Sequence, residues 1–275
     1  MKVLSLINMK GGVAKTTLAI NIADCLARRH ASRVLIIDVD PQFNATQCLM
    51  DPESYVNHLK DGKDTILTVF DRTKRPVASA VAHSSKLEPK QLENISVVKI
   101  KNNLHLLPGN LELYRLEMAP GDGRENRLKN YLQKIEGQYD FVVIDTPPTP
   151  SVWMTSALIA SDHYLIPVRP DPISLTGIDL LRSIIEEKKE NFDLNITCAG
   201  LVLTVTEENT VVFANAKRNL QSDDYWQKFL FKSTLPKRTR IAQGQLDQIQ
   251  ILDGENNESK AFITSITTEL LNRMD

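Results

Sequence analysis

The chain alternates short runs of consecutive apolar residues with longer segments in which apolar residues recur at helical spacing. Continuous apolar runs are typical of strands that are buried on both faces of a parallel sheet. The pattern therefore predicts an α/β fold with a mostly parallel, doubly wound sheet flanked by helices. The predicted strands are residues 3–8, 34–38, 141–145, 163–168 and 196–204, and the helices between them are 16–29, 152–160 and 174–188.

The chain shows neither an internal repeat nor a long linker, so we predict one domain over residues 1–275. The exception is a variable segment, residues 51–103, which is charged and has no clear period. Within it we predict only a short helix at 65–70 and an exposed turn at 72–76. Two interpretations stay open for this segment, an elaboration of the scaffold or a surface for a partner.

The last predicted helix, residues 259–275, has one apolar stripe and ends in acidic residues as well as basic ones. A helix that docks on a membrane surface is usually richer in lysine and arginine. We therefore predict that this helix packs against the sheet, and we expect no membrane partner. The apolar stripe consists of Phe262, Ile263, Ile266, Leu270 and Leu271.

Composition narrows the classes of protein. With 42% hydrophobic residues, the 275-residue chain can bury a substantial core. Its first apolar run is too short for a signal peptide and no membrane-length apolar span follows, so we expect a soluble, cytoplasmic protein. Cys25, Cys48 and Cys198 fit neither a disulfide framework nor a zinc site, and we predict buried small residues. Because the net charge is −1, nucleic-acid binding would need a local basic patch.

The first predicted strand and helix are joined by residues 8–17, NMKGGVAKTT. At such a junction, backbone N–H groups and the positive end of the helix dipole converge on an anion. Gly11 and Gly12 permit a tight turn and the close approach of phosphate oxygens. Lys15 would then reach the β- and γ-phosphates, and the hydroxyl of Thr16 would bind Mg²⁺. An ordinary glycine turn would not require the lysine and the paired threonines.

This stretch departs from the strict phosphate-loop pattern, because Met9 and Ala14 stand where its two glycines belong. Residues 10–17 resemble instead the deviant Walker A box of the ParA and MinD family of ATPases. The resemblance covers residues 1–205, weakens across the variable segment and resumes at 235–243. Three further motifs are similar to those of the family: VLIIDVDPQFNAT at 34–46, FVVIDTPP at 141–148 and LIPVRPDPISLTGIDLL at 165–181.

The resemblance implies a role for each residue of the loop. Lys10 would be the signature lysine, which crosses to a partner subunit and contacts the nucleotide there, so that two ATP molecules are sandwiched in a homodimer. The alternative for Lys10 is a solvated side chain at the edge of the loop. Lys15 would hold the phosphates of its own ATP. The nucleotide-binding loop would consist of Gly11, Gly12, Val13, Ala14, Lys15, Thr16 and Thr17.

Two aspartates, Asp38 and Asp145, end predicted strands, where ligands bind in open α/β sheets. A charge at the end of an apolar strand is costly unless it faces a cation or a hydrogen-bond network, so we predict that Asp38 and Thr16 contribute to the Mg²⁺ shell. Asp145 would bind Mg²⁺ through water. The resemblance implies that Asp40 orients the attacking water. As an alternative, Asp40 is a helix N-cap, with Pro41 as the first helical residue.

Selection of the base is implied by the resemblance alone. It places adenine near Thr204, at a strand end, and against the loop that contains Pro236 and Lys237. In both places the residues of this sequence differ from those that are more common in the family. The resemblance therefore favours ATP over GTP, and the residues themselves identify no contact to the base.

Residues 217–240 contain seven basic and two acidic residues, a local net charge of +5. Non-specific DNA binding needs several lysines or arginines near phosphates and no base readout. The resemblance to partition ATPases implies that this segment forms a DNA-binding surface, and a solvated helix and loop is the alternative. Because the first strand begins at residue 3, we expect no sequence-reading extension before it. The candidate DNA contacts are Lys217, Arg218, Lys232, Arg238 and Arg240.

Together the motifs predict an ATPase that uses ATP and Mg²⁺ as a dimerisation switch. The resemblance implies that the ATP-bound dimer binds DNA non-specifically, that slow hydrolysis dissolves it, and that a cargo-bound adaptor of ParB type stimulates hydrolysis. Such a protein would be associated with the nucleoid and would move a plasmid, a chromosome or another cargo. Three alternatives stay open: a MinD-like regulatory ATPase that acts on a protein or membrane partner, a metabolic P-loop ligase, and a module that binds nucleotide without hydrolysing it.

Overall fold

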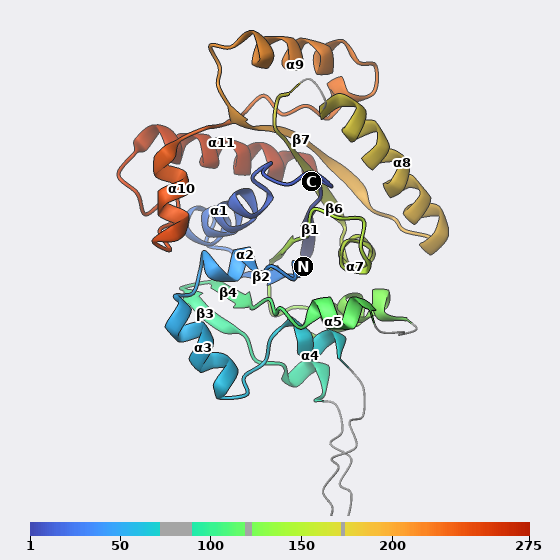
Figure 1. The fold of residues 1–275 in the computed structure, drawn as a ribbon, viewed down its shortest axis with the longest axis vertical. Coiled ribbons are helices and arrows are strands. Elements are labelled where there is room, and N and C mark those ends of the chain that lie inside the picture. Colours follow the sequence, from blue (N-terminus) through green and yellow to red (C-terminus); the bar gives the residue numbers. More distant parts are fainter. Residues whose placement is uncertain (72–89, 119–122, 172–173) are drawn as a thin grey trace, which may run out of the picture.

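The structure is a computed structural model that describes residues 1–71, 90–118, 123–171 and 174–275, so the turn predicted at 72–76 lies outside it. The described residues form an eight-stranded sheet in the order β3-β4-β2-β5-β1-β6-β7-β8 (Figure 1). Every neighbouring pair is parallel except β3 and β4, an antiparallel pair at one edge. The strands are β1 (Lys2–Leu6), β2 (Val34–Asp38), β3 (Val98–Lys101), β4 (Leu104–Leu107), β5 (Phe141–Asp145), β6 (His163–Val168), β7 (Thr197–Thr206) and β8 (Leu235–Pro236).

The central strands are buried on both faces, as their continuous apolar sequences predict. In β2, Val34 and Ile36 pack against the helices of one face. The alternate residues, Leu35 and Ile37, pack against the helices of the other face. The bounds of β2, β5 and β6 match those predicted, and the mostly parallel α/β sheet expected from the sequence is confirmed.

Helices cover both faces of the sheet (Figure 1). On one face, Leu18 and Ile22 of α1 share a core with Ile263 and Leu270 of α11. On the other face, α4, α5, α6 and α7 cover one half and α8 and α9 cover the rest. The helices are α1 (Lys15–Arg29), α2 (Asn44–Gln47), α3 (Pro52–Lys60), α4 (Ile66–Phe70), α5 (Leu113–Met118), α6 (Arg127–Lys134), α7 (Val152–Ala160), α8 (Ser174–Phe192), α9 (Val211–Ser222), α10 (Thr239–Leu246) and α11 (Asn257–Met274), with short 3-10 turns η1 (Leu92–Asn94), η2 (Arg124–Asn126) and η3 (Trp226–Lys228).

Part of the variable segment is integrated into the scaffold. Ile66, Val69 and Phe70 of α4 are fully buried, and the ring of Phe70 packs edge-on against Trp153 of α7 with centroids 4.8 Å apart. Further along the same segment, β3 joins the sheet at its edge. α4 and β3 therefore belong to the scaffold, whereas a surface for a partner stays open for the mostly exposed helix α3. The short helix predicted at 65–70 is α4, whereas the sequence pattern missed α3 and β3.

The C-terminal helix packs as predicted, because Ile263, Ile266 and Leu270 are fully buried against the sheet. Among the described residues, none of the helices combines the length and apolar character that a membrane crossing needs. Of the three cysteines, Cys25 is buried as predicted, whereas Cys48 and Cys198 are only half-buried. All three are free thiols.

Candidate nucleotide site

The phosphate loop leaves β1 and enters α1 at the carboxyl edge of the sheet. Gly12 has a φ of 71° and Ala14 a φ of 61°, a left-handed conformation that suits glycine and strains alanine. A Cβ added at Gly11 or Gly12 would meet no atom within 4 Å, so the loop has open space beside it. Since the N-cap residue of α1 supplies no side-chain acceptor, the first N–H groups of the helix can bind an anion.

Lys15 points back along this loop, and its ammonium donates a hydrogen bond to the backbone carbonyl of Lys10 at 3.2 Å. Lys15 is 7% exposed. Burial lowers the pKa of Lys15, while the carboxylates of Asp145 and Asp40 oppose that shift. A partly desolvated ammonium that is bonded to a neutral carbonyl gains a stronger, charge-assisted acceptor when a phosphate oxygen takes that place.

Thr16 and Asp145 form the candidate magnesium position. The hydroxyl of Thr16 donates to Oδ2 of Asp145 at 2.7 Å, while Oδ1 is buried and has no hydrogen-bond partner in the described structure. Burial raises the pKa of Asp145 to about 7, against the opposing effects of Thr16 and Lys15. Mg²⁺ prefers oxygen ligands and keeps several of its waters. A carboxylate oxygen without a partner, beside a hydroxyl, fits a hydrated Mg²⁺ held by these two side chains.

Asp38 has different partners from the Mg²⁺ shell that we predicted for it. Its Oδ2 accepts hydrogen bonds from the backbone N–H and the hydroxyl of Thr46, both at 2.8 Å, and its Oδ1 accepts from the N–H of Asp40 at 3.2 Å. Burial, followed by the charge of Asp145, raises the pKa of Asp38 well above its ordinary value. These hydrogen bonds fix the loop after β2, and the place of Asp38 in the Mg²⁺ shell stays a prediction.

Asp40 lies in a turn between β2 and α2. Its Oδ1 accepts a hydrogen bond from the N–H of Gln42 at 2.9 Å, and α2 begins only at Asn44. The alternative that Asp40 is a helix N-cap followed by Pro41 is therefore wrong. Asp40 is 5% exposed, and burial raises its pKa. Its carboxylate lines the same cavity as the phosphate loop.

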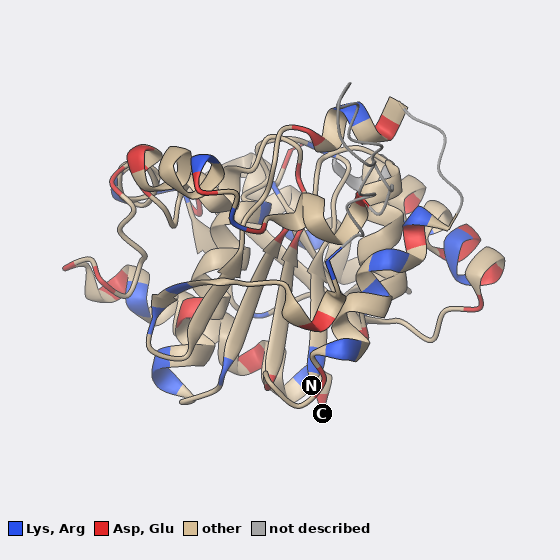
Figure 2. Ribbon diagram, turned by 90° about the horizontal axis from the view of Figure 1, so that it is seen from below, with Lys and Arg blue, Asp and Glu red and all other residues tan. Residues whose placement is uncertain are grey.

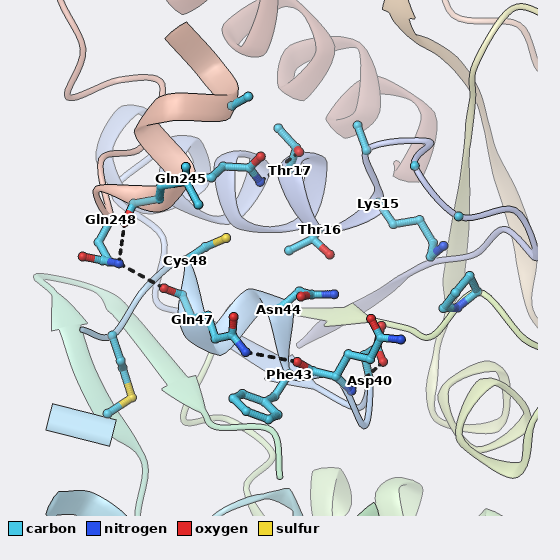
Figure 3. A pocket seen from close by; sticks show the side chains of 18 of the residues that line it. Lys15, Thr16, Thr17, Asp40, Phe43, Asn44, Gln47, Cys48, Gln245 and Gln248 are labelled. Atoms are coloured by element: carbon cyan, nitrogen blue, oxygen red, sulfur yellow. Dashed lines mark hydrogen bonds between the residues drawn. The ribbon is translucent and has the colours of Figure 1, made fainter. Parts of the chain in front are cut away.

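That cavity has a volume of about 830 Å³ and extends from the phosphate loop between α1, α2 and α10 (Figure 3). The volume is typical of a site for a small organic ligand. Lys15 and Asp40 lie at one end, and the amides of Gln245 and Gln248 lie at the other, with Cys48 between them. Burial raises the pKa of Cys48 to about 12, so its thiol is unreactive at neutral pH.

The residues predicted to hold the adenine base do not line this cavity in the described structure. Thr204 is fully buried, and its hydroxyl donates to the carbonyl of Val13 at 2.9 Å, which braces the phosphate loop. Pro236 is buried in β8, and the ammonium of Lys237 lies 2.8 Å from a carboxylate oxygen of Glu207. The base contacts therefore stay a prediction, whereas amides of α10 and the loop after it face the cavity.

Comparison with known proteins identifies the family. Residues 1–198 match a protein-family model that is described as an AAA domain. Cell division protein PomZ of Myxococcus xanthus is 31% identical over 96% of this chain and 77% of PomZ, and chromosome partitioning protein ParA of the same organism is 27% identical over 88% of this chain and 77% of that protein. The chain belongs to the ParA-like P-loop ATPases. In fold, this ParA-like ATPase is similar to the crystal structure of a putative plasmid partition protein from Borrelia burgdorferi bound to AMPPNP, with a TM-score of 0.75 and 20% identity over 99% of this chain and 97% of that one.

Lys10 of this ParA-like ATPase lies next to the cavity but does not line it. Its ammonium forms an ion pair with Asp171, which follows β6, and its side chain is 45% exposed. Its backbone N–H is held by Oδ1 of Asn8 at 2.8 Å. The structure therefore separates the two lysines of the loop, because Lys15 faces the cavity and Lys10 points toward a neighbouring strand end.

The candidate DNA contacts of this ParA-like ATPase are spread over separate elements. Lys217 and Arg218 lie on α9 and Arg240 lies on α10, and these two helices are apart (Figure 1). Arg238 pairs with Glu258 at 3.1 Å, and acidic and basic residues are intermixed along the chain (Figure 2). The +5 charge counted in the sequence is therefore partly neutralised. In the part of the chain that the structure describes, the exposed candidates without an ion pair are Arg218, Lys232 and Arg240.

Gly109 supports the loop that carries the site aspartates. Its N–H donates to the hydroxyl of Thr46 at 2.8 Å, and a Cβ at this position would lie 2.6 Å from Cβ of Phe43 and 3.0 Å from the carboxyl carbon of Asp38. We expect Gly109→Ala to lower the free energy of unfolding by about 1–3 kcal/mol, because backbone and buried atoms must move. Urea unfolding measures this loss. Gly177→Ala on α8, where a Cβ meets open space, is the control, and equal effects of the two substitutions would contradict the account.

Three functional residues of this ParA-like ATPase were missed by the sequence interpretation. Thr46 was part of a quoted motif, and its spacing from Asp38 gave no sign that it donates twice to that carboxylate. Gln245 and Asp171 come from segments far from the phosphate loop, so only the fold brings them to it. Asp171 lies three residues after the end of β6, and an acidic residue so close to a strand end was the signal that could have singled it out.

Proposed function

We propose that this ParA-like ATPase is a nucleotide-dependent dimerisation switch that positions a cargo, with ATP and Mg²⁺ as its cofactors. The observation that supports the proposal most directly is the placement of the two loop lysines. Lys15 faces the cavity, where it can hold the phosphates of a nucleotide in its own subunit. Lys10 lies outside that cavity and is partly exposed, so it is available to a nucleotide bound by a second copy.

The residues at the cavity supply the steps that such a switch needs. Lys15 and the N-terminal N–H groups of α1 bind the phosphates, and Thr16 with Asp145 holds Mg²⁺, which neutralises charge on the transferred phosphoryl group. Asp40 lines the same end of the cavity as Lys15, so its carboxylate can orient an attacking water at the phosphates. Hydrolysis then removes the terminal phosphate that Lys10 contacts across the dimer, and the dimer dissociates.

The relatives support a role in positioning. PomZ is a cell division protein, and ParA of the same organism is a chromosome partitioning protein. We propose that the ATP-bound dimer binds DNA non-specifically at the nucleoid and that a cargo adaptor of ParB type stimulates hydrolysis. Dimerisation doubles the number of basic side chains offered to DNA phosphates, and the affinity rises steeply with that number. Arg218, Lys232 and Arg240 are the contacts that the structure leaves exposed.

DNA binding tests this proposal. We expect a gel mobility shift with ATP and none with ADP, and a binding constant that falls steeply between about 50 and 200 mM salt. Arg240→Ala is expected to remove one phosphate contact per subunit, which lowers the slope of log affinity against log salt by about two for a dimer. Arg33→Ala, which removes an arginine paired with Asp140 at 2.8 Å, is the control.

The same assays separate the other classes. A protein that stays monomeric with ATP, ignores DNA and turns over a small-molecule substrate would be a metabolic P-loop ligase. A protein that dimerises with ATP but binds a protein or lipid partner in place of DNA would be a MinD-like regulator. Equal DNA binding with ATP and with ADP would overturn the proposed switch.

A further inference from the structure

We infer that Asp171 is a positioning residue, which holds Lys10 within its own subunit until a nucleotide is bound. The inference rests on the proposed function, because it concerns how Lys10 becomes available to a second subunit. Asp171 lies three residues after the end of β6 at Val168, and its carboxylate forms an ion pair with the ammonium of Lys10. The two side chains are 24% and 45% exposed, respectively, so the pair is in contact with solvent.

Three groups of Lys10, its ammonium, its carbonyl and its N–H, each contact a nearby residue. Its ammonium is paired with Asp171, and its carbonyl accepts a hydrogen bond from Lys15 at 3.2 Å. Its N–H donates to Oδ1 of Asn8 at 2.8 Å, and the side-chain amide of Asn8 donates to the carbonyl of Pro167 in β6 at 2.7 Å. The start of the phosphate loop is thus attached to the strand that leads into Asp171.

The hydrogen bond from Lys15 links this arrangement to the nucleotide. When phosphate oxygens become the acceptors of the Lys15 ammonium, the Lys10 carbonyl loses its donor. The ion pair with Asp171 is then the main restraint on the Lys10 side chain. A partly exposed ion pair is a weak restraint, and a triphosphate presents several negative charges where Asp171 presents one. Lys10 is therefore retained in the absence of nucleotide and released to the triphosphate of the second subunit.

A second carboxylate lies in the same surroundings. Asp171 and Glu207 border a hollow of about 330 Å³ at the carboxyl ends of β6 and β7. Glu207 pairs with Lys237, so it places a similar charge at this hollow without holding Lys10.

The test is the ATP concentration at which half of the protein is dimeric, measured by sedimentation velocity on the full chain. Asp171→Asn is expected to lower this concentration by about 3- to 10-fold, because each subunit loses one restraint. The affinity of the monomer for ATP should stay unchanged. It is measured by comparing the double variant Asp171→Asn/Lys10→Ala with Lys10→Ala alone, because Lys10→Ala keeps the protein monomeric. Asp171→Glu, which keeps the charge, should restore a threshold close to the original one.

Glu207→Gln is the matched control, since it neutralises a carboxylate that borders the same hollow but pairs with Lys237 and not with Lys10. It should leave the threshold within about 2-fold of the original. If Asp171→Asn needs the same or a higher ATP concentration, or if Glu207→Gln has an equal effect, the inference is wrong. If Asp171→Asn does not fold, Asp171→Ser replaces it with the same expectations. A parent protein that never dimerises with ATP would instead contradict the proposed function.

Discussion

Lys15→Ala is expected to reduce the affinity for ATP by about 100-fold or more, close to 3 kcal/mol of binding free energy. Lys15 is the cation that the structure places inside the cavity, and it is 7% exposed with Asp145 and Asp40 nearby. Removing its ammonium leaves two carboxylates facing the phosphates without a compensating charge from this loop. Isothermal titration calorimetry with ATP in the presence of Mg²⁺ measures the loss.

The neighbouring lysine provides the control for this experiment. Lys10→Ala removes an ammonium from the same loop, but from a side chain that does not line the cavity, so its affinity for ATP should stay within about 3-fold of the original. Binding by Lys15→Ala at the original affinity would show that the phosphates lie elsewhere. Equal losses for the two variants would contradict the division of roles between them.

Asp40→Ala is expected to lower the turnover number for ATP by about 100-fold or more, the effect of removing a group that orients or deprotonates an attacking water. ATP binding should be preserved, so the ATP-bound dimer accumulates. The structure supports this role because the Asp40 carboxylate faces the cavity, and its contact with the N–H of Gln42 fixes its direction. Phosphate release and sedimentation velocity measure turnover and dimer on the same samples.

Asp40→Asn tests whether turnover depends on the negative charge of Asp40 or only on a side chain of that shape. It keeps an acceptor for the N–H of Gln42, so the turn should remain, whereas the loss of the negative charge should still slow turnover. Normal turnover in both variants would assign the water to another residue. Loss of folding in Asp40→Ala alone would show that its main role is to hold the turn.

The sheet could be predicted from the sequence because its central strands are continuous apolar runs. β2 and β5 lie side by side with Asp38 opposite Asp145, so two strand ends with aspartates meet at one edge as expected for parallel strands. The edge strand β3 and its neighbour β4 were missed. β3 has exposed and half-buried positions in four residues, VKIK, which is too short for a clear alternation.

The site was only partly predictable for a related reason. The phosphate loop is one continuous stretch, and its chemistry could be read from the residue types at known spacing. The hydrogen bonds to Asp38 come from Thr46, eight residues later, and depend on the close approach of Gly109. The amide end of the cavity comes from α10 and the loop after it, more than 200 residues from the phosphate loop. Such contacts follow from the fold and leave no periodic signal in the sequence.

We propose that Lys10 acts on the nucleotide of a second subunit. Once calorimetry has shown that Lys10→Ala binds ATP, sedimentation velocity of this variant with saturating ATP and Mg²⁺ tests the role of Lys10 in dimerisation. We expect the parent protein to sediment as a dimer and the variant to sediment as a monomer with its ATP site filled. A Lys10→Ala protein that forms the dimer at the same ATP concentration as the parent would contradict the proposal.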